Sequence, residues 1–584
     1  MTPRPCRPAR WWAAALLSTT LAGCSAIPEQ SPVEQGPALD QAPRQEVSVE
    51  VEPPPQDATP EQVVTGFLRT GIDDTGDHRV GREYLTDAAS ASWEPGARVL
   101  VQDQRAGQGV TALAGDTVRV NLAVLGEVDA SGRLTEAAPG ERADLTFGLE
   151  QVDGQWRIDS LPSDTGIVLS QADFQRLYQP VDVHWGSPVS EELVPQRRWL
   201  RSGEGMTSAL GRLQTEPVPR VLEGAVSTGV PAGTRLETAA VPVSDGTAVL
   251  RLSDTMVGAD PAQRNLAWAQ YAATMRQLPG VDAVSLFVGG NLVDAESDAV
   301  GERLSYPQGA GYSVVSVVVP LVLLHQRQAL QAADPGSAEL EPLAQPQELR
   351  VPSVPSRWDR MAVSADFRTV AAVDGRVLGV WREGALTTYT ARGELSVPSM
   401  DPLGFLWTTQ GQEEDTEVLV LDTSRRGGRP ESLSVPWLGD EQVVQVRMSP
   451  DGARALVVLR GGGRDRVAVV GVVRGPGGEP TSLTEPRPIA PQVGGVQDLA
   501  WIDEHSVALL GTPGPDGEQK VWRSELGGWT ELQGSVDNAV AVAAYPDERE
   551  DGLLVTTEGG RVLTKAGATW FVANVASEVV VPGR

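Results

Sequence analysis

The chain has 584 residues, with 77 acidic and 48 basic side chains and a formal net charge of -29. Phosphate backbones would repel so acidic a protein, which argues against binding to nucleic acid. Cys6 and Cys24 are its two cysteines, so a disulfide framework, a cysteine-ligated metal and a thiol nucleophile are not expected.

The first residues predict an export signal rather than part of a fold. Arg4, Arg7 and Arg10 form a positive region, and an apolar stretch follows from 11 to 21. That stretch is shorter than the roughly 20 residues of a membrane-spanning helix. It ends in Leu21, Ala22, Gly23 and Cys24, which resemble the lipobox of bacterial lipoproteins. The resemblance implies removal of residues 1–23 and a lipidated Cys24, carrying N-palmitoyl and S-diacylglycerol groups. An ordinary secretory signal is the alternative.

Residues 24–58 are predicted to be the lipidated cysteine and a disordered tether. From position 25 onward the segment is rich in Pro, Glu, Gln and Asp and includes the run 53–55 of three prolines. So little apolar surface cannot offset the entropy lost on ordering.

Residues 59–180 predict an α+β domain that begins with a helix. Thr59 can cap that helix, Pro60 suits its first position, and Gln62 completes a capping box. A second helical stretch is predicted near 82–85. Apolar residues then alternate from Val118 to Val124 and from 145 to 149, and Asp153-Gly154 predicts a hairpin turn. Helices followed by a curved sheet resemble the cone of nuclear transport factor-like domains, here favoured as structural rather than ligand-binding.

Residues 181–299 predict a second α+β domain. Segments 230–236 and 241–253 precede a helix that carries Leu266, Trp268 and Met275, and a strand follows at 284–288. Within 241–253, Asp245-Gly246 predicts a turn between two strands. The order of these elements and the sequences of the segments are similar to those of the GerMN domain, a small α+β module of bacterial cell-surface proteins.

Residues 300–355 are predicted to connect this domain to the next and to end in a Pro-, Ala- and Glu-rich linker. The run from Val314 to Leu324 is apolar, which raises the alternative of a second membrane segment. It is too short for one and contains Pro320, so a buried strand is favoured.

Residues 356–584 predict an all-β propeller of five to six blades. Apolar strands meet acidic turns at positions 366, 401, 451, 503 and 547, which lie 35, 50, 52 and 44 residues apart. That spacing suits four-stranded blades, with a sixth blade completed from strands at both ends of the region. A stack of sheets without ring closure is the alternative. Eight tryptophans are expected to fill gaps between blades, at positions 358, 381, 407, 437, 501, 522, 529 and 570.

A search for chemistry predicts no catalytic residue, no metal site and no cofactor. The histidines, at positions 78, 184, 325 and 505, are isolated, and neither lysine follows a serine at the spacing of a Ser-x-x-Lys nucleophile. The cluster Glu413-Glu414-Asp415 is interpreted as a solvated loop, with a calcium site as the alternative. A pair of catalytic carboxylates like that of glycosidases is an alternative that the sequence leaves undecided.

The order of signal, helix-led domain, GerMN-like module and propeller resembles the LpqB lipoprotein family of actinobacteria. The resemblance rests on 21–24, on Val194-Pro195-Gln196-Arg197-Arg198-Trp199-Leu200, on 230–253 and on Val363-Ser364; residues 307–341 do not align. It implies a lipid-anchored protein on the extracytoplasmic side of the cell membrane. It also implies an accessory role in the MtrA/MtrB two-component system, by binding the extracytoplasmic part of an MtrB-like sensor kinase, linked to envelope homeostasis and division. A periplasmic glycan hydrolase and a passive module that binds peptidoglycan or a small ligand are the alternatives.

Overall fold

The computed structural model describes residues 51–583 except for 74, 115, 204, 295–302, 316–318, 351–352, 413–414, 426, 515–516 and 548–551. Residues 51–584 form one compact unit. The predicted signal, lipobox and lipidation site at 21–24 lie outside the described residues, as do Glu413 and Glu414 of the acidic cluster.

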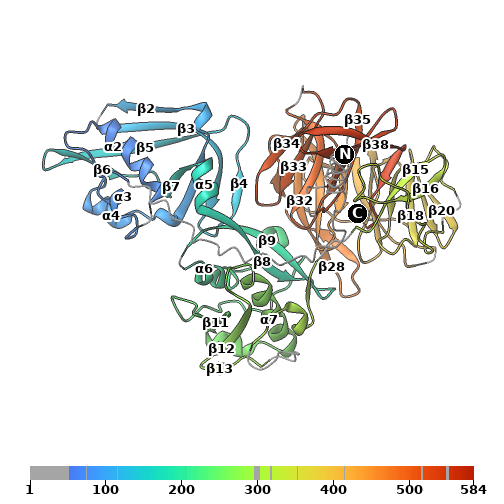
Figure 1. The fold of residues 1–584 in the computed structure, drawn as a ribbon, viewed down its shortest axis with the longest axis horizontal. Coiled ribbons are helices and arrows are strands. Elements are labelled where there is room, and N and C mark those ends of the chain that lie inside the picture. Colours follow the sequence, from blue (N-terminus) through green and yellow to red (C-terminus); the bar gives the residue numbers. More distant parts are fainter. Residues whose placement is uncertain are drawn as a thin grey trace, which may run out of the picture. The chain divides into compact units, whose positions relative to one another are not determined.

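The N-terminal module begins with the predicted helix. Helix α2 (Pro60–Arg69) is capped by Thr59, and the side chains of Thr59 and Gln62 each bond the other's backbone N–H, so the predicted capping box is confirmed. Helices α3 (Arg79–Arg82), α4 (Asp87–Ser92) and α5 (Gln171–Leu177) complete the helical part. Helix α2 packs across the sheet through its buried face, which includes Val64 and Phe67 (Figure 1).

The sheet of this module has the order β6-β5-β3-β1-β7, and β2 and β4 also pair with β3. Its strands are β1 (Arg98–Gln102), β2 (Gln108–Leu113), β3 (Thr117–Asp129), β4 (Leu134–Glu136), β5 (Arg142–Val152), β6 (Gln155–Ser160) and β7 (Ile167–Ser170). The predicted alternation is confirmed at Val118, Val120 and Leu122, which are buried. Asp153 and Gly154, both with positive φ, turn β5 into β6 as predicted.

The second module combines a long hairpin with a small sheet. The hairpin consists of β8 (Tyr178–Gly186) and β9 (Glu192–Arg201). Its other elements are α6 (Met206–Leu213), β10 (Val243–Ser244), β11 (Thr247–Leu252), α7 (Pro261–Met275), β12 (Ala283–Val288), β13 (Asn291–Leu292) and β14 (Ser313–Val314). The hairpin predicted at Asp245-Gly246 is confirmed by β10 and β11, whereas 230–236 forms only one bridge, from Leu236 to Leu252.

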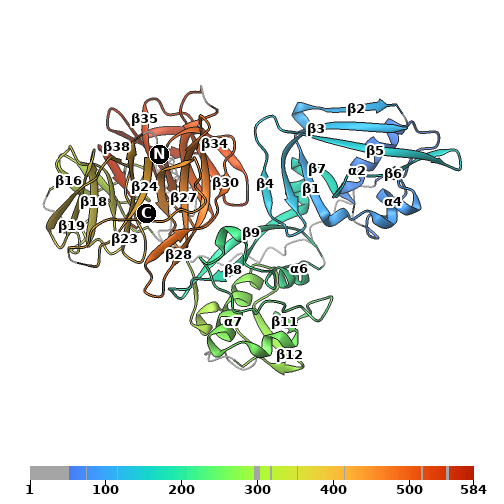
Figure 2. The same cartoon turned by 180° about the vertical axis from the view of Figure 1, so that it is seen from behind.

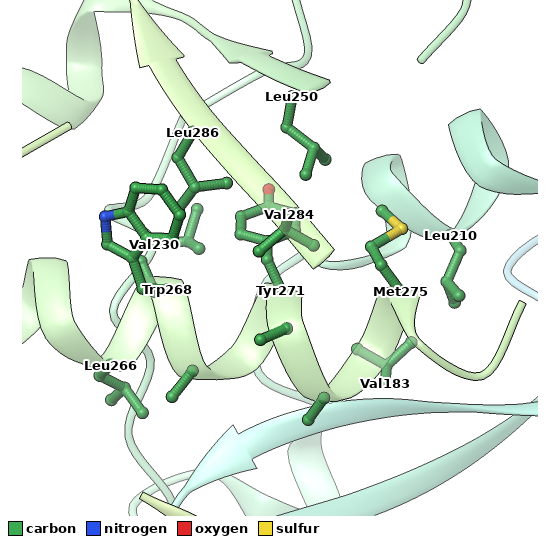
Figure 3. Close-up of a cluster of buried hydrophobic side chains, with 14 of the residues drawn as sticks. Val183, Leu210, Val230, Leu250, Leu266, Trp268, Tyr271, Met275, Val284 and Leu286 are labelled. Atoms are coloured by element: carbon green, nitrogen blue, oxygen red, sulfur yellow. The ribbon is translucent and has the colours of Figure 1, made fainter. Parts of the chain in front are cut away.

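Helix α7 makes the crossover between the parallel strands β11 and β12. It is buried nearly all round, because the sheet covers one side and the β8–β9 hairpin the other. Figure 3 shows Trp268, Tyr271 and Met275 of this helix pointing toward Leu250, Val284 and Leu286 of the sheet. The predicted helix and the strand after it are therefore confirmed.

The C-terminal domain is a propeller, as predicted. Its described strands form six sheets, of which five are consecutive in sequence (Figures 1 and 2). The sheets are β17 (Asp359–Val363) to β20 (Ala385–Thr390), β21 (Glu394–Leu395) to β25 (Glu431–Ser432), β26 (Gln442–Met448) to β30 (Arg487–Ile489), β31 (Gly494–Trp501) to β34 (Thr530–Gly534), and β35 (Ala539–Tyr545) to β38 (Thr569–Val575).

The remaining strands of these blades are β18 (Thr369–Asp374), β19 (Val377–Arg382), β22 (Ser399–Met400), β23 (Phe405–Gln412), β24 (Asp415–Asp422), β27 (Arg454–Gly461), β28 (Arg464–Arg474), β29 (Pro480–Leu483), β32 (Ser506–Thr512), β33 (Lys520–Glu525), β36 (Gly552–Thr557) and β37 (Arg561–Ala566).

The sixth sheet joins strands from the two ends of the propeller region, in the order β16-β15-β39. Strand β15 (Val322–Gln326) pairs with β16 (Ala329–Ala333) on one side and with β39 (Glu578–Val580) on the other, with Leu323 opposite Val580. Strands β15 and β16 come from the stretch that the sequence assigns to a connection. The apolar run there contributes the buried strand β15, and residues 316–318 of that run lie outside the described part.

The segment after β16 takes the place of a fourth strand in this sheet. The backbone N–H of Leu343 donates to Ala332 O at 2.9 Å, and the N–H of Asp334 donates to Glu341 O at 2.8 Å. Farther along, the side chain of Gln345 makes the hydrogen bonds to β16 that a strand backbone would make. Its Nε2 donates to Leu330 O at 2.9 Å, and its Oε1 accepts from Ala332 N at 3.3 Å. A proline-rich stretch therefore satisfies the outer edge of the blade without forming a regular strand.

Candidate functional site

The acidic turn residues that revealed the repeat stabilise turns of the propeller. Asp451 accepts from the backbone N–H groups of Ala453 and Arg454, and Asp503 accepts from those of His505 and Ser506. Asp401 does the same for Leu403 and Phe405. Because these carboxylates accept hydrogen bonds from the backbone of their own turns, the repeated acidic positions have a structural role.

The histidines were predicted to be isolated, and this is wrong for two of them. His184 and His505 share Asp182 as a charged neighbour, with His505 Nε2 3.4 Å from Asp182 Oδ2. His325 lies between Val354 O and the Ser577 hydroxyl, at 2.8 and 2.9 Å. His184 is buried, with Nδ1 3.1 Å from the Thr274 hydroxyl, and burial lowers its pKa to about 4. No group of three or more His, Cys, Asp or Glu side chains with the arrangement of a metal site occurs in the part of the chain that the structure describes.

The propeller encloses a cavity of about 850 Å³ among its innermost strands. Residues from all six sheets line it, including Arg360, Glu394, Gln442, Gln497 and Glu578. This volume falls within the roughly 300–1,000 Å³ of small-molecule sites. Acidic, basic and amide side chains line it together, which suits the recognition of a polar partner. No catalytic role is predicted from the sequence for any of these lining residues.

A buried ion pair holds the wall of this cavity. Arg447 Nη2 lies 2.9 Å from Asp498 Oδ1, while its Nε donates to Leu499 O and its Nη1 donates to Val397 O. Asp498 also accepts from Gln445 Nε2 and, through Oδ2, from the backbone N–H of Val542. Inner strands of neighbouring blades are thus fixed to one another around the cavity.

Strand β9 contains the segment 194–200 quoted for the family resemblance, and it contacts both flanking modules. The indole N–H of Trp199 donates to Gly527 O of the propeller at 2.7 Å, and its backbone N–H donates to Gly132 O of the N-terminal module at 2.7 Å. Arg197 forms ion pairs with Asp182 at 3.3 Å and with Glu525 at 3.5 Å.

The N-terminal module also bonds the propeller directly. The Glu136 carboxylate accepts from the Thr530 hydroxyl at 2.6 Å and from the Thr530 backbone N–H at 3.1 Å. Burial raises the pKa of Glu136, although these hydrogen bonds oppose the rise. Trp529, expected between blades, instead packs against the N-terminal core with its ring 6.0 Å from that of Phe174, so that prediction is wrong for Trp529.

Sequence reasoning did not identify the cavity wall or this junction. The pair Arg447–Asp498 joins residues 51 positions apart, and Glu136 bonds a residue 394 positions away. The only signal available was the density of Arg and Trp in 197–199, two residue types that are frequent at binding interfaces.

Among the described residues, no helix is both long enough and apolar enough to cross a membrane.

Comparisons with known proteins match every module. The model of the lipoprotein LpqB N-terminal domain matches 53–175, the sporulation and spore germination model matches 176–294, and the lipoprotein LpqB beta-propeller model matches 341–582. The two LpqB models together cover more than half of the chain. The predicted family resemblance and the predicted fold classes are therefore confirmed.

Two full-length relatives extend this match. A lipoprotein LpqB of Cutibacterium acnes is 26% identical over 583 residues, covering 96% of each chain. One from Streptomyces coelicolor is 27% identical over 634 residues, covering 99% of this chain and 98% of its own. Among solved structures, the tandem GerMN domains of GerM from Bacillus subtilis are 18% identical, with a TM-score of 0.19, and cover 26% of this chain and 59% of their own.

Proposed function

Since the chain belongs to the LpqB lipoprotein family, we propose that this envelope lipoprotein is anchored by lipid on Cys24 to the extracytoplasmic side of the cell membrane. The lipobox at 21–24 and the cysteine within it support the anchor. Several acyl chains on one cysteine stabilise attachment, because each buried CH₂ contributes about 0.8 kcal/mol.

We infer further that the protein acts by binding, as an accessory regulator of the MtrA/MtrB two-component system that contacts the ectodomain of an MtrB-like sensor kinase. The observation that carries this proposal is the match to one family from end to end, in the same order of modules. The partner follows from the family resemblance. The structural roles of the acidic turns and histidines agree with recognition rather than catalysis.

The mouth of the propeller cavity is the face we propose for this contact. Exposed charged side chains from different inner strands meet there, among them Arg360 and Glu394. Because the inner strands are held by buried bonds such as Arg447–Asp498, these charges are presented with little ordering cost on binding. The net charge of -29 would steer a basic surface toward the protein.

The experiment that tests the proposal is reconstitution of the kinase and the lipidated protein in the same vesicles. We expect the rate of kinase autophosphorylation to change when the lipoprotein is present. Glu394→Arg should weaken the effect, whereas Glu431→Arg, the same change on the outer strand β25 of the same sheet, should leave it intact.

Unchanged kinase activity at saturating lipoprotein would contradict the regulatory role. Equal effects of the two charge reversals would contradict the cavity mouth as the contact face. Retention of the protein on purified peptidoglycan, with no effect on the kinase, would favour the alternative of a passive envelope-binding module.

A further inference from the structure

A small cavity lies where strand β9 meets the propeller. It has a volume of about 40 Å³ and is lined mainly by aliphatic side chains. Its polar side chains are Gln196 and Arg197 from β9, and Arg454, Arg487 and His505 from the propeller. Three guanidinium groups and no carboxylate therefore line this cavity, in a chain whose acidic residues far outnumber its basic ones.

Two of the three arginines are neutralised by carboxylates outside the lining. Arg454 Nε donates to Asp451 Oδ2 at 2.8 Å, and Arg197 pairs with Asp182 at 3.3 Å and with Glu525 at 3.5 Å. Arg487 differs from both. Within the described residues its side chain forms no ion pair, and its one hydrogen bond runs from Nη2 to Leu134 O at 2.7 Å. One positive charge at the cavity therefore has no ion-pair partner within 4 Å among the described residues, although Asp129 lies near enough to act on it electrostatically.

A second unpaired guanidinium lies close by. Arg198 is only 1% exposed, and its Nη atoms donate to the neutral acceptors Arg197 O and Gln196 Oε1, at 3.0 and 2.9 Å. Its Nε is buried and has no hydrogen-bond partner in the described structure. Burial and the neighbouring Arg133 lower the pKa values of both Arg198 and Arg487. Asp129, and for Arg198 also Glu216, oppose this fall but do not cancel it, so both positive charges are only partly compensated.

The size and chemistry of the cavity restrict what it can hold. A water molecule needs about 10–15 Å³ of such space, so about 40 Å³ accommodates one monatomic anion with a water molecule beside it. Small-molecule sites are roughly ten times larger, at about 300–1,000 Å³, which excludes nucleotides, sugars and lipid headgroups. The free N–H groups of Arg487 and the amide of Gln196 are donors suited to an anion.

We propose that this cavity is a binding site for a monovalent inorganic anion of the chloride class, held chiefly by Arg487 and Gln196. A guanidinium with no ion-pair partner in a mainly apolar surrounding is costly, and a bound anion offsets that cost. Because Gln196 lies on β9 and Arg487 on the propeller, the anion links the GerMN-like module to the propeller. Binding therefore stabilises the folded protein in proportion to ln(1 + [anion]/Kd). This site is independent of the proposed kinase contact.

The test compares thermal unfolding of the full-length protein, purified in a non-ionic detergent, in sodium chloride and in sodium gluconate of equal ionic strength. We expect the Tm to rise with chloride by a few degrees more than with gluconate, and to saturate. Arg487→Gln should abolish the chloride-specific rise. Arg368→Gln, which changes an arginine whose side chain is 67% exposed, should retain it.

Equal Tm values in the two salts, or a chloride-specific rise that survives in Arg487→Gln, would overturn the proposal. If Arg487→Gln does not fold, crystals of the wild-type protein soaked in sodium bromide supply an independent answer. We expect an anomalous peak within contact distance of Arg487 and Gln196. Bromide peaks confined to the protein surface would overturn the site.

Discussion

The Arg447 guanidinium and the Asp498 carboxylate form a buried ion pair on the wall of the propeller cavity, with Nη2 2.9 Å from Oδ1. The pair joins strand β26 to strand β31, and both partners make further hydrogen bonds to the backbone of neighbouring blades. Each buried charged group in this wall needs a partner, since an unsatisfied polar group in the interior would lower the stability of the folded protein.

Removing one partner of this pair is expected to destabilise the propeller strongly. Asp498→Ala leaves the Arg447 charge buried and unpaired, which costs about 3–5 kcal/mol of unfolding free energy. Glu431→Ala, an exposed residue on the outer strand β25, should change it by no more than about 0.5 kcal/mol. Urea unfolding followed by tryptophan fluorescence measures both variants. A loss below about 1 kcal/mol for Asp498→Ala would show that the pair contributes little.

Deletion of residues 576–584 should open the propeller ring. The deletion removes β39 and with it the pairing of Leu323 with Val580. It also removes the Ser577 hydroxyl beside His325 and the Glu578 carboxylate that accepts from the Met361 backbone N–H. We expect the propeller transition in calorimetry to shift to a lower temperature and to broaden. A truncated protein that melts cooperatively at the wild-type temperature would contradict closure by β39.

Features set by local sequence were predictable. The capping box of Thr59 and Gln62 and the turns at Asp153-Gly154 and Asp245-Gly246 depend on residues within a few positions of one another. The acidic turns marked five blades for the same reason. Helix α7 was evident because its apolar residues recur at helical spacing.

Features set by distant pairing were not predictable from one sequence. The sixth blade joins β15 to β39, which lie about 250 residues apart. The outer edge of its strand β16 is satisfied by the irregular segment that follows it, partly through the Gln345 side chain. Trp529 lies between two strands of a blade in sequence, yet it packs against Phe174 of another module. Such contacts depend on how modules dock, which leaves no periodic signal in the chain.

His184 is expected to stay neutral far below the usual pH for a histidine. Burial lowers its pKa to about 4, and the opposing effect of Asp182 does not restore it. The unfolded chain binds a proton near pH 6.5 and the folded protein does not, so this residue's contribution to stability falls as pH drops from about 6.5 to about 4, at roughly 1.4 kcal/mol per pH unit. NMR titration of the ring should give a midpoint near 4; a midpoint near 6.5 would contradict this account.

Cys24→Ser should abolish the membrane anchor. Serine has no thiol to accept diacylglycerol, so the precursor should remain unlipidated and uncleaved by the lipoprotein peptidase. Metabolic labelling with a radioactive fatty acid, followed by membrane fractionation, measures the change. Cys6→Ser is the matched control, because Cys6 lies in the segment expected to be removed. Lipid-labelled mature protein in the Cys24→Ser strain would show that the anchor lies elsewhere.

The central claim is that the protein binds the extracytoplasmic domain of an MtrB-like kinase. The most direct test measures binding of residues 51–584 to that purified domain by biolayer interferometry at several salt concentrations. We predict saturable binding whose association rate falls as salt rises, because acidic residues far outnumber basic ones in the chain and this charge contributes to the encounter. We also predict weaker binding for Glu394→Arg than for Glu431→Arg. Absence of binding at high micromolar concentrations, in low salt and with both proteins folded, would contradict the claim.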